Sequence, residues 1–272
     1  LYSGGFVGRA EKLLDIYNSE NKGELAGKHN GGFVGYSDTV GIVSIRASVN
    51  EALFTVSKNF KDSTRNGGVA AIGMGEWTVE DFVNKSDISG MYAGGFFGWF
   101  RSFESYTGGK GWVKSSFKIR NSINEGNIGS LLDTTGYVLG GIVGTLYSSY
   151  DDYQLSDLDR NLITNVVNKG NIYGSRKAYQ MGGIVGHNKY SWLFIDGVEN
   201  YGNIENQNVN YIYVGGILGY GNGIDSVVNS ANYGNINLSG DDNDADVVLG
   251  GIVSVSPNTD VIRCANYGDI HI

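Results

Sequence analysis

Aromatic and acidic side chains gather in segments of this chain where they could bind a ligand. Residues 99–117 and 145–161 interleave Trp, Tyr and Phe with Asp, Ser and Glu, and residues 187–194 form a shorter segment of the same kind. Flat aromatic faces stack on the apolar faces of sugars while neighbouring polar groups bind hydroxyls, and Tyr- and Trp-rich surfaces serve protein recognition equally well. The candidate ligand-binding residues are Trp99, Tyr106, Trp112, Tyr147, Tyr150, Tyr153, Tyr190 and Trp192.

Four aspartates in the second of these segments raise the question of catalysis. Paired carboxylates act as acid and base, or as nucleophile, when glycosidic bonds are cleaved. These four neighbour each other in one loop, whereas a catalytic pair converges from separate rigid strands. A polysaccharide-cleaving enzyme is therefore the less favoured interpretation, and we expect no catalytic activity. The four residues are Asp151, Asp152, Asp157 and Asp159.

Other catalytic motifs are missing from the sequence. The histidines, His29, His187 and His271, form neither His-Glu-x-x-His nor a zinc pattern with the single cysteine, and we interpret them as isolated surface residues. No Gly-x-Ser-x-Gly elbow or Walker-type loop occurs. We therefore expect no cofactor apart from the calcium ion considered next.

Residues 241–246 read Asp-Asp-Asn-Asp-Ala-Asp and contain the Asp-x-Asp-x-Asp spacing that opens a calcium loop. An EF-hand is excluded, because its glycine and its terminal glutamate are replaced by Val247 and Val253. A weak structural calcium site is one interpretation. A solvated acidic turn between two strands is the other, and we favour it. The candidate calcium ligands are Asp242, Asp244 and Asp246.

Two short motifs alternate eight times and define the elements that must position these residues. A Gly-Gly pair followed by an apolar pair begins at residues 4, 31, 67, 94, 140, 182, 215 and 250. An Asn-x-Gly-x-Ile-like segment begins at residues 21, 50, 84, 124, 168, 200, 232 and 266. The mean period of about 35 residues indicates stacked repeats, each burying its apolar face against its neighbours. A β-branched residue lies five positions before every Asn: Ile16, Ile45, Val79, Ile119, Ile163, Ile195, Val227 and Val261.

Three short strands per repeat follow from this pattern: through the Ile/Val column, the Asn motif and the Gly-Gly motif. The Gly-Gly strand should point its first apolar residue inward and the second outward. We expect the Asn to adopt left-handed backbone and to hydrogen-bond from coil to coil. The predicted fold is an all-β, parallel β-helix-like solenoid of about eight coils. The alternative is a β-propeller, whose blades of fixed length fit poorly with periods of 27 to 46 residues.

The aromatic residues lie where the repeat is interrupted. From Gly-Gly to Asn the distance is 16 to 19 residues in six repeats, but 30 in the fourth and 28 in the fifth. Insertions in repeat proteins form loops along one edge. A ligand-binding edge is one interpretation. The other, slightly favoured from the sequence, is that the aromatic residues fold down and cover the outward apolar column of the Gly-Gly strands.

Composition and charge exclude several classes of protein. The net charge of −8 and the absence of basic clusters argue against nucleic acid and anionic membranes as partners. No apolar run is long enough to span a bilayer, so we expect no membrane insertion by this segment. Because both ends fall inside a repeat, residues 1–272 are interpreted as a single monomeric repeat domain excised from a longer protein.

The repeats resemble a known motif family. Gly140-Gly141-Ile142-Val143-Gly144, its counterparts at residues 31–35 and 182–186, and partners such as Asn168-Lys169-Gly170-Asn171-Ile172 are similar to GLUG-motif repeats. These occur in large secreted or wall-attached bacterial proteins, including streptococcal IgA-cleaving metallopeptidases and adhesin-like proteins of gut bacteria. The resemblance implies a non-catalytic stalk or binding region, extracellular or attached to the cell wall.

The function expected from the sequence is therefore that of an adhesin-type stalk. Its aromatic edge would contact a host or dietary glycan, or a host surface protein. The alternative is a structural spacer beside a catalytic domain.

Overall fold

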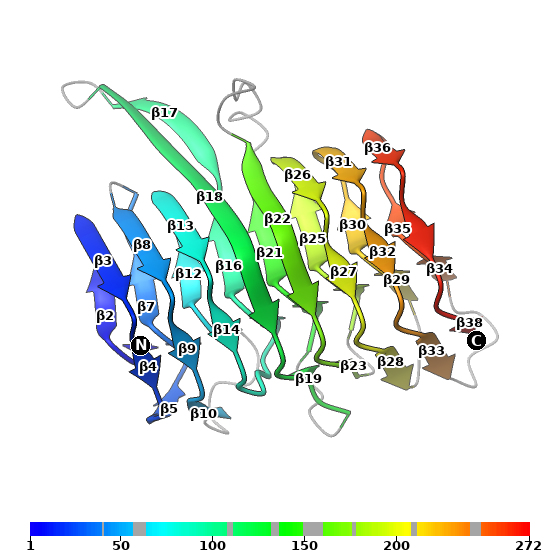
Figure 1. Cartoon of the computed structure of the whole chain (residues 1–272), viewed down its shortest axis with the longest axis horizontal. Coiled ribbons are helices and arrows are strands. Elements are labelled where there is room, and N and C mark those ends of the chain that lie inside the picture. Colours follow the sequence, from blue (N-terminus) through cyan, green and yellow to red (C-terminus); the bar gives the residue numbers. More distant parts are fainter. Residues whose placement is uncertain are drawn as a thin grey trace.

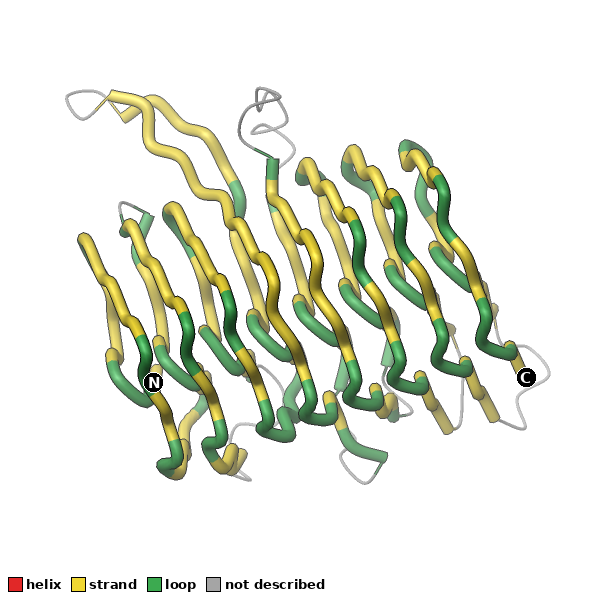
Figure 2. The backbone as a smooth tube through the Cα atoms, in the orientation of Figure 1, coloured by secondary structure: helices red, strands yellow, loops and turns green. Residues whose placement is uncertain are grey.

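The computed structural model describes residues 1–39, 41–56, 64–107, 111–131, 136–148, 160–175, 178–207, 211–239 and 246–272. Within these residues every regular element is a β-strand, and the chain winds through eight stacked coils (Figures 1 and 2). Equivalent strands of successive coils pair in parallel. This confirms the all-β solenoid and excludes the propeller, whose blades are antiparallel. The described part contains no helix that is long and apolar enough to cross a bilayer.

The strands form columns along the rod. The first column, which ends at the first Gly of each pair, contains β1 (Tyr2–Gly4), β6 (His29–Gly31), β11 (Arg65–Gly67), β15 (Tyr92–Gly94), β20 (Val138–Gly140), β24 (Gln180–Gly182), β29 (Tyr211–Gly215) and β34 (Asp246–Gly250). The second column contains β2 (Val7–Ala10), β7 (Val34–Ser37), β12 (Ala70–Gly73), β16 (Phe97–Arg101), β21 (Val143–Tyr147), β25 (Val185–Lys189), β30 (Leu218–Gly221) and β35 (Val253–Val255).

The third column carries the Ile/Val residues and continues into the Asn motif. Its strands are β3 (Leu13–Tyr17), β8 (Ile42–Arg46), β13 (Glu76–Glu80), β18 (Gly111–Asn124), β22 (Asn161–Asn168), β26 (Trp192–Asp196), β31 (Ile224–Val228) and β36 (Thr259–Ile262). The Asn strands of the same sheet are β4 (Glu20–Asn21), β9 (Val49–Asn50), β14 (Val83–Asn84), β27 (Glu199–Asn200), β32 (Ala231–Asn232) and β37 (Ala265–Asn266).

The fourth column follows the corner after the Asn, so a coil contains more strands than the three that the sequence predicted. The column contains β19 (Ile128–Gly129), β23 (Ile172–Gly174), β28 (Ile204–Gln207), β33 (Ile236–Ser239) and β38 (Ile270–His271). Two strands of the first coils, β5 (Glu24–Gly27) and β10 (Leu53–Val56), form a separate pair. One antiparallel hairpin, β17 (Phe103–Thr107) with β18, projects beyond the coils at the top of Figure 1.

The sequence predicted one straight strand through the Gly-Gly motif, and this prediction is wrong. The chain bends after the first Gly, and the second column begins at the second apolar residue. Phe33 and Val34, which follow one pair, are both 0% exposed and belong to the same core. The expected outward apolar column is therefore wrong, because the bend turns both residues inward. That column needs no cover from the aromatic segments.

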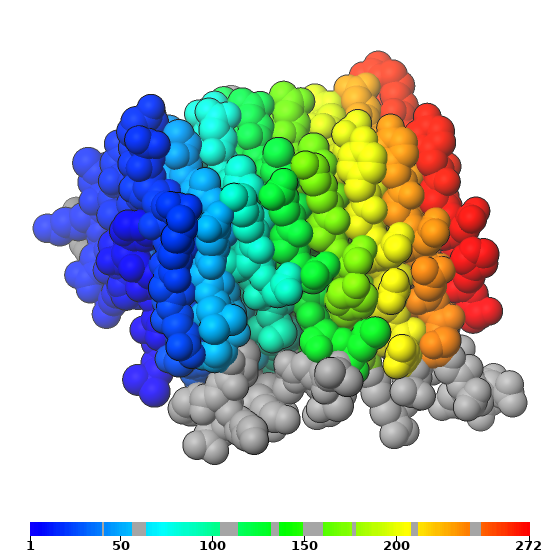
Figure 3. All heavy atoms as spheres, turned by 60° about the horizontal axis from the view of Figure 1, so that its bottom comes forward, coloured from blue at the N-terminus to red at the C-terminus, as the bar shows by residue number. Residues whose placement is uncertain are grey.

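The bend divides the interior into two cores. One lies between the second and third columns and includes Phe96, Phe117 and Ile163. The other lies between the first and fourth columns and includes Leu139, Met181 and Ile172. Both run through successive coils, so each coil packs only against its neighbours, as the stripes of Figure 3 show.

The second Gly of each pair packs against the Asn of the other motif and forms a waist between the two cores. A Cβ on Gly183 would lie 2.0 Å from the carbonyl oxygen of Gly216 and 2.5 Å from Cγ of Asn200. The equivalent glycine of every coil meets the equivalent Asn in the same way, from Gly5 on Asn21 to Gly251 on Asn266. This contact explains why the two motifs alternate strictly along the sequence.

The Asn side chains form the predicted hydrogen-bonded ladder. Asn124 Nδ2 donates to Asn168 Oδ1 at 2.7 Å, and Asn168 Nδ2 donates in turn to Asn200 Oδ1 at 2.7 Å. Asn168 Nδ2 also donates to the carbonyl oxygen of Gly170 at 2.9 Å. The ladder runs from Asn21 to Asn266. Because its members between Asn50 and Asn232 are fully buried, these bonds satisfy amides that water cannot reach.

The left-handed backbone does not occur at the ladder Asn, where we expected it. It occurs three residues earlier in every coil, where the third column bends into the Asn strand, with φ between 48° and 63°. Asn and Asp tolerate this conformation better than other non-glycine residues. The column consists of Asn18, Ala47, Asp81, Asn121, Asn165, Gly197, Asn229 and Arg263.

Candidate functional site: an aromatic groove

Two columns of side chains border the Gly-Gly bend on the outside of the solenoid. One lies two residues before the first Gly: Tyr2, His29, Arg65, Tyr92, Val138, Gln180, Tyr213 and Val248. The other lies five residues after it: Arg9, Tyr36, Ile72, Trp99, Thr145, His187, Tyr220 and Val255. We call the surface between them the aromatic groove.

Rings from the two columns contact each other across the bend. Tyr92 and Trp99 have ring centroids 5.4 Å apart, and Tyr213 and Tyr220 have centroids 4.8 Å apart. A similar contact, at 5.0 Å, joins Tyr2 to Tyr36. Neither column belongs to a core, so these rings lie on the surface. The row of rings is interrupted at the third coil, where the two columns carry Arg65 and Ile72.

The middle of the groove contains a cavity of about 370 Å³. Tyr137 stacks on Tyr179 along one wall, with centroids 5.5 Å apart and planes 10° apart. Trp99 meets Tyr147 edge to face along the other, at 5.8 Å. The lining residues are Tyr92, Trp99, Tyr137, Val138, Thr145, Tyr147, Tyr179, Gln180, His187, Lys189, Tyr220 and Asn222.

Several buried polar atoms in the lining have no hydrogen-bond partner within the protein. They are Trp99 Nε1, Thr145 Oγ1, His187 Nε2 and Asn222 Oδ1. Buried polar groups are nearly always hydrogen-bonded, to protein, water or a ligand. The set includes donors and acceptors beside flat rings, which is the combination that a polar ligand with apolar faces requires.

Two histidines of the groove are neutral at physiological pH. Burial is the main cause that lowers the pKa of both His29 and His187 to about 4. His29 Nδ1 also accepts a hydrogen bond from the amide of Arg65 at 3.2 Å. The interpretation of His29 and His187 as surface residues is therefore wrong: His29 is 5% exposed, and His187 lines the cavity.

The residues predicted to bind a ligand differ in their position relative to the cavity. Trp99 and Tyr147 line the cavity. Tyr190 follows β25, and Lys189 links it to the groove, with Nζ 5.4 Å from the ring centroid of Tyr147 and 5.6 Å from that of Tyr190. Trp192 begins β26 in the third column and contacts Arg160 instead.

The remaining predicted positions are only partly covered by the structure. Tyr106 and Trp112 are paired in the backbone register of the β17–β18 hairpin. Tyr150, Tyr153 and the four aspartates from Asp151 to Asp159 lie outside the described residues, as do Asp242 and Asp244. Asp246 is exposed at the start of β34. Within the described ranges no group of three or more His, Cys, Asp and Glu side chains could hold a metal ion, so the calcium site stays a prediction.

Sequence reasoning missed most of the groove, including Tyr92, Tyr137, Tyr179 and Tyr220. These residues lie outside the two insertions, on which the sequence analysis concentrated. When the repeats are aligned on their Gly-Gly pairs, the positions two before and five after the first Gly are rich in aromatic side chains. This pattern could have indicated the groove.

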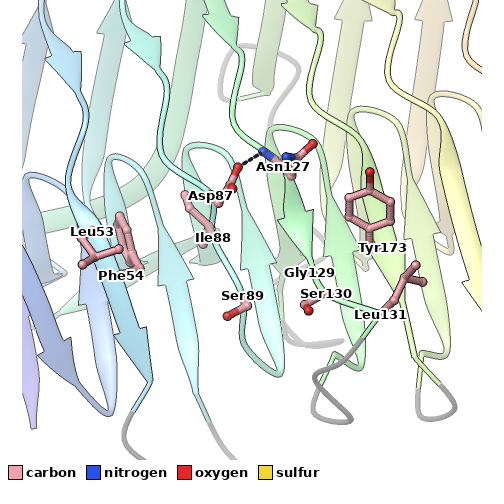
Figure 4. A pocket seen from close by; sticks show the side chains of 10 residues that line it. All are labelled: Leu53, Phe54, Asp87, Ile88, Ser89, Asn127, Gly129, Ser130, Leu131 and Tyr173. Atoms are coloured by element: carbon pink, nitrogen blue, oxygen red, sulfur yellow. Dashed lines mark hydrogen bonds between the residues drawn. The ribbon is translucent and has the colours of Figure 1, made fainter.

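A second cavity, of about 410 Å³, lies between the β5–β10 pair and the start of the fourth column at β19 (Figure 4). Phe54 and Tyr173 lie at opposite ends of its lining, and Asp87 accepts a hydrogen bond from the amide of Asn127 at 2.7 Å. Its two rings, Phe54 and Tyr173, are separated and form no stacking wall. Its carboxylate, Asp87, is already hydrogen-bonded. The aromatic groove is the stronger candidate.

One carboxyl group is buried in the core of the seventh coil. Asp225 is 2% exposed and is bonded to Asn188, Ser256 and Thr259, with no cation among its partners. Burial raises the pKa of Asp225 to about 7, and these hydrogen bonds oppose the rise. The folded chain therefore retains a proton on Asp225 that the unfolded chain releases near pH 4.

We expect this carboxyl to destabilise the fold as pH rises. Between pH 4 and 7 the native state binds more protons at Asp225 than the unfolded state does. The contribution of Asp225 to the free energy of unfolding therefore decreases as pH rises. His29 and His187, whose pKa values are lowered, act in the opposite direction between pH 4 and 6.5. The test is therefore a comparison with Asp225→Asn by urea unfolding. Wild type should lose about 2 kcal/mol relative to the variant between pH 5 and 7.5, and a constant difference would contradict the burial argument.

Comparisons with known proteins identify no family for this chain. No protein-family model matches the chain, and no curated protein matches it. A similar solved structure is that of a putative immunoglobulin A1 protease from Bacteroides ovatus. It is 15% identical, with a TM-score of 0.46, and the match covers 100% of this chain and 79% of that one. The likeness to GLUG repeats rests on the motifs alone.

Proposed function

We propose that this chain is a non-catalytic repeat region of a bacterial secreted or cell-surface protein, and that its aromatic groove binds a glycan. The observation that supports this most directly is the cavity of the groove, where stacked rings adjoin polar atoms without a protein partner. Sugar rings present apolar faces to aromatic side chains and hydroxyls to donors and acceptors.

The shape of the groove favours an extended ligand over a compact one. Ring contacts between neighbouring residues run from Tyr92 through Tyr137, Tyr179 and Tyr213 to Tyr220, across four coils. Successive coils are about 4.8 Å apart, so the row extends for roughly 15 Å. An oligosaccharide chain lying along the rod would meet a ring at each coil.

The proposal is tested by binding to a broad glycan array, followed by titration of any hit. Trp99→Ala should weaken binding at least tenfold, because it removes a wall of the cavity and the ring contacts with Tyr92 and Tyr147. Trp192→Ala is the matched control: it removes the same side chain from outside the cavity lining and should leave affinity unchanged.

Thermal unfolding of both variants separates lost recognition from lost folding. A blank array would contradict glycan binding and favour the structural spacer. Equal losses in Trp99→Ala and Trp192→Ala would contradict the assignment of the groove as the site. A substrate that the chain cleaved, with release of reducing ends, would contradict the non-catalytic proposal.

A further inference from the structure

The groove contains a half-buried cation that has no anionic partner among the described residues. Arg65, in β11, places its guanidinium carbon 3.8 Å from the ring centroid of Trp99 and 5.4 Å from that of Tyr92. Its Nε has no hydrogen-bond partner, and burial lowers the pKa of Arg65 from its ordinary value. A guanidinium held this way loses hydration without gaining a counter-charge.

The cations of the groove differ in whether they pair with a carboxylate. Arg9, at the N-terminal end, donates to Asp38 at 2.8 Å and forms a second ion pair with Glu11. Arg65 and Lys189 form no ion pair with any carboxylate in the described part of the chain. Among the described residues, no Asp or Glu belongs to the lining of the cavity.

The charge of the groove is thus opposite to that of the chain. The protein has 28 acidic residues against 20 basic ones. The described residues of the cavity lining nevertheless include one cation, Lys189, and no acid, and Arg65 lies beside the Trp99 wall. Three coils separate Arg65 from Lys189, or roughly 14 Å along the rod. An anionic ligand that satisfied both would have to be longer than one sugar unit.

We propose that the groove recognises an oligosaccharide carrying carboxylate groups, with Arg65 binding one carboxylate beside the Trp99 ring. This inference rests on the proposed glycan function and names its ligand class. The planar guanidinium matches a carboxylate with two parallel hydrogen bonds, while its face remains stacked on the indole. A neutral sugar would leave the charge of Arg65 uncompensated.

Titration calorimetry with three oligosaccharides of matched length tests the inference. The probes are an oligogalacturonate, its fully methyl-esterified form, which is neutral, and a sulfated heparin fragment. We expect the oligogalacturonate to bind at least tenfold more tightly than its ester, and more tightly than the sulfated fragment. Added salt should reduce this preference.

Variants of Arg65 test whether this residue causes the preference for the acid over the ester. Arg65→Met keeps the length of the side chain and should reduce the acid-over-ester ratio to near one. Arg65→Lys keeps the charge but loses the planar fork, and should retain only part of the ratio. Arg46→Met, which removes an exposed arginine from the third column, should leave it unchanged. Arg65→Lys remains informative if Arg65→Met does not fold.

The outcomes separate this inference from the proposed function. Tight binding of acid and ester alike, or an acid preference that survives in Arg65→Met, overturns the inference and leaves glycan binding standing. Equal or tighter binding of the sulfated fragment overturns the choice of carboxylate. Failure of all three probes, together with a blank array, overturns the proposed function itself.

Discussion

Gly183→Ala is expected to destabilise the protein by about 4 kcal/mol or more, among the largest effects of a single methyl group. The added Cβ would lie 2.0 Å from the carbonyl oxygen of Gly216 in the next coil and 2.5 Å from Cγ of Asn200. Neither neighbour can withdraw. The carbonyl belongs to the backbone of the bend, and Asn200 is fixed by its ladder bonds on both sides. Urea unfolding monitored by circular dichroism measures the loss.

Gly8→Ala is the matched control. Gly8 lies in β2, is exposed, and would place a Cβ with nothing within 4 Å. We expect a change within about 1 kcal/mol, since only the entropy of the unfolded chain is altered. If Gly183→Ala were as mild as Gly8→Ala, the waist would be looser than the structure shows.

Asn168→Ala should cost about 4 kcal/mol or more. It removes three hydrogen bonds, with Asn124, Asn200 and the carbonyl of Gly170, and it leaves Asn200 Oδ1 buried without its donor. Net hydrogen bonds contribute roughly 1 kcal/mol each, and an unpaired buried group costs roughly 1 to 3 kcal/mol more. Chemical unfolding checks the value.

The end of the ladder provides the comparison for this variant. Asn266 accepts from Asn232 at 2.8 Å and donates to Gly268, but its side chain is exposed in the last coil. Water can replace the partners that Asn266→Ala removes, so we expect a loss below about 1 kcal/mol. Equal losses at Asn168 and Asn266 would show that burial does not set the strength of the ladder.

The repeat architecture could be predicted because it depends on periodicity. Columns such as Ile163 and Asn168 recur in every coil, and parallel stacking places like residues on like, so spacing alone indicates the ladders. The bend after Gly31 could not be predicted in the same way. Pleat alternation assumes a straight strand, and only the close approach of Gly32 to Asn50 shows that this strand turns.

The groove was missed for a related physical reason. The sequence shows that Tyr92 and Trp99 are aromatic, but whether they meet depends on the direction in which the chain bends between them. With a straight strand they would lie far apart, whereas the bend brings their centroids to 5.4 Å. Trp192, which composition placed with Trp99, instead begins a strand of the third column and contacts Arg160.

The direction of the inter-coil bonds has a mechanical consequence. Backbone bonds such as those between β22 and β26, and the amide ladder through Asn168, run along the rod, so tension between the two ends loads them lengthwise. A coil occupies about 4.8 Å of the rod, yet its roughly 35 residues reach about 120 Å when pulled straight. Coils peeled one at a time from an end would lengthen the chain in steps, dissipating load while the coils behind stay folded.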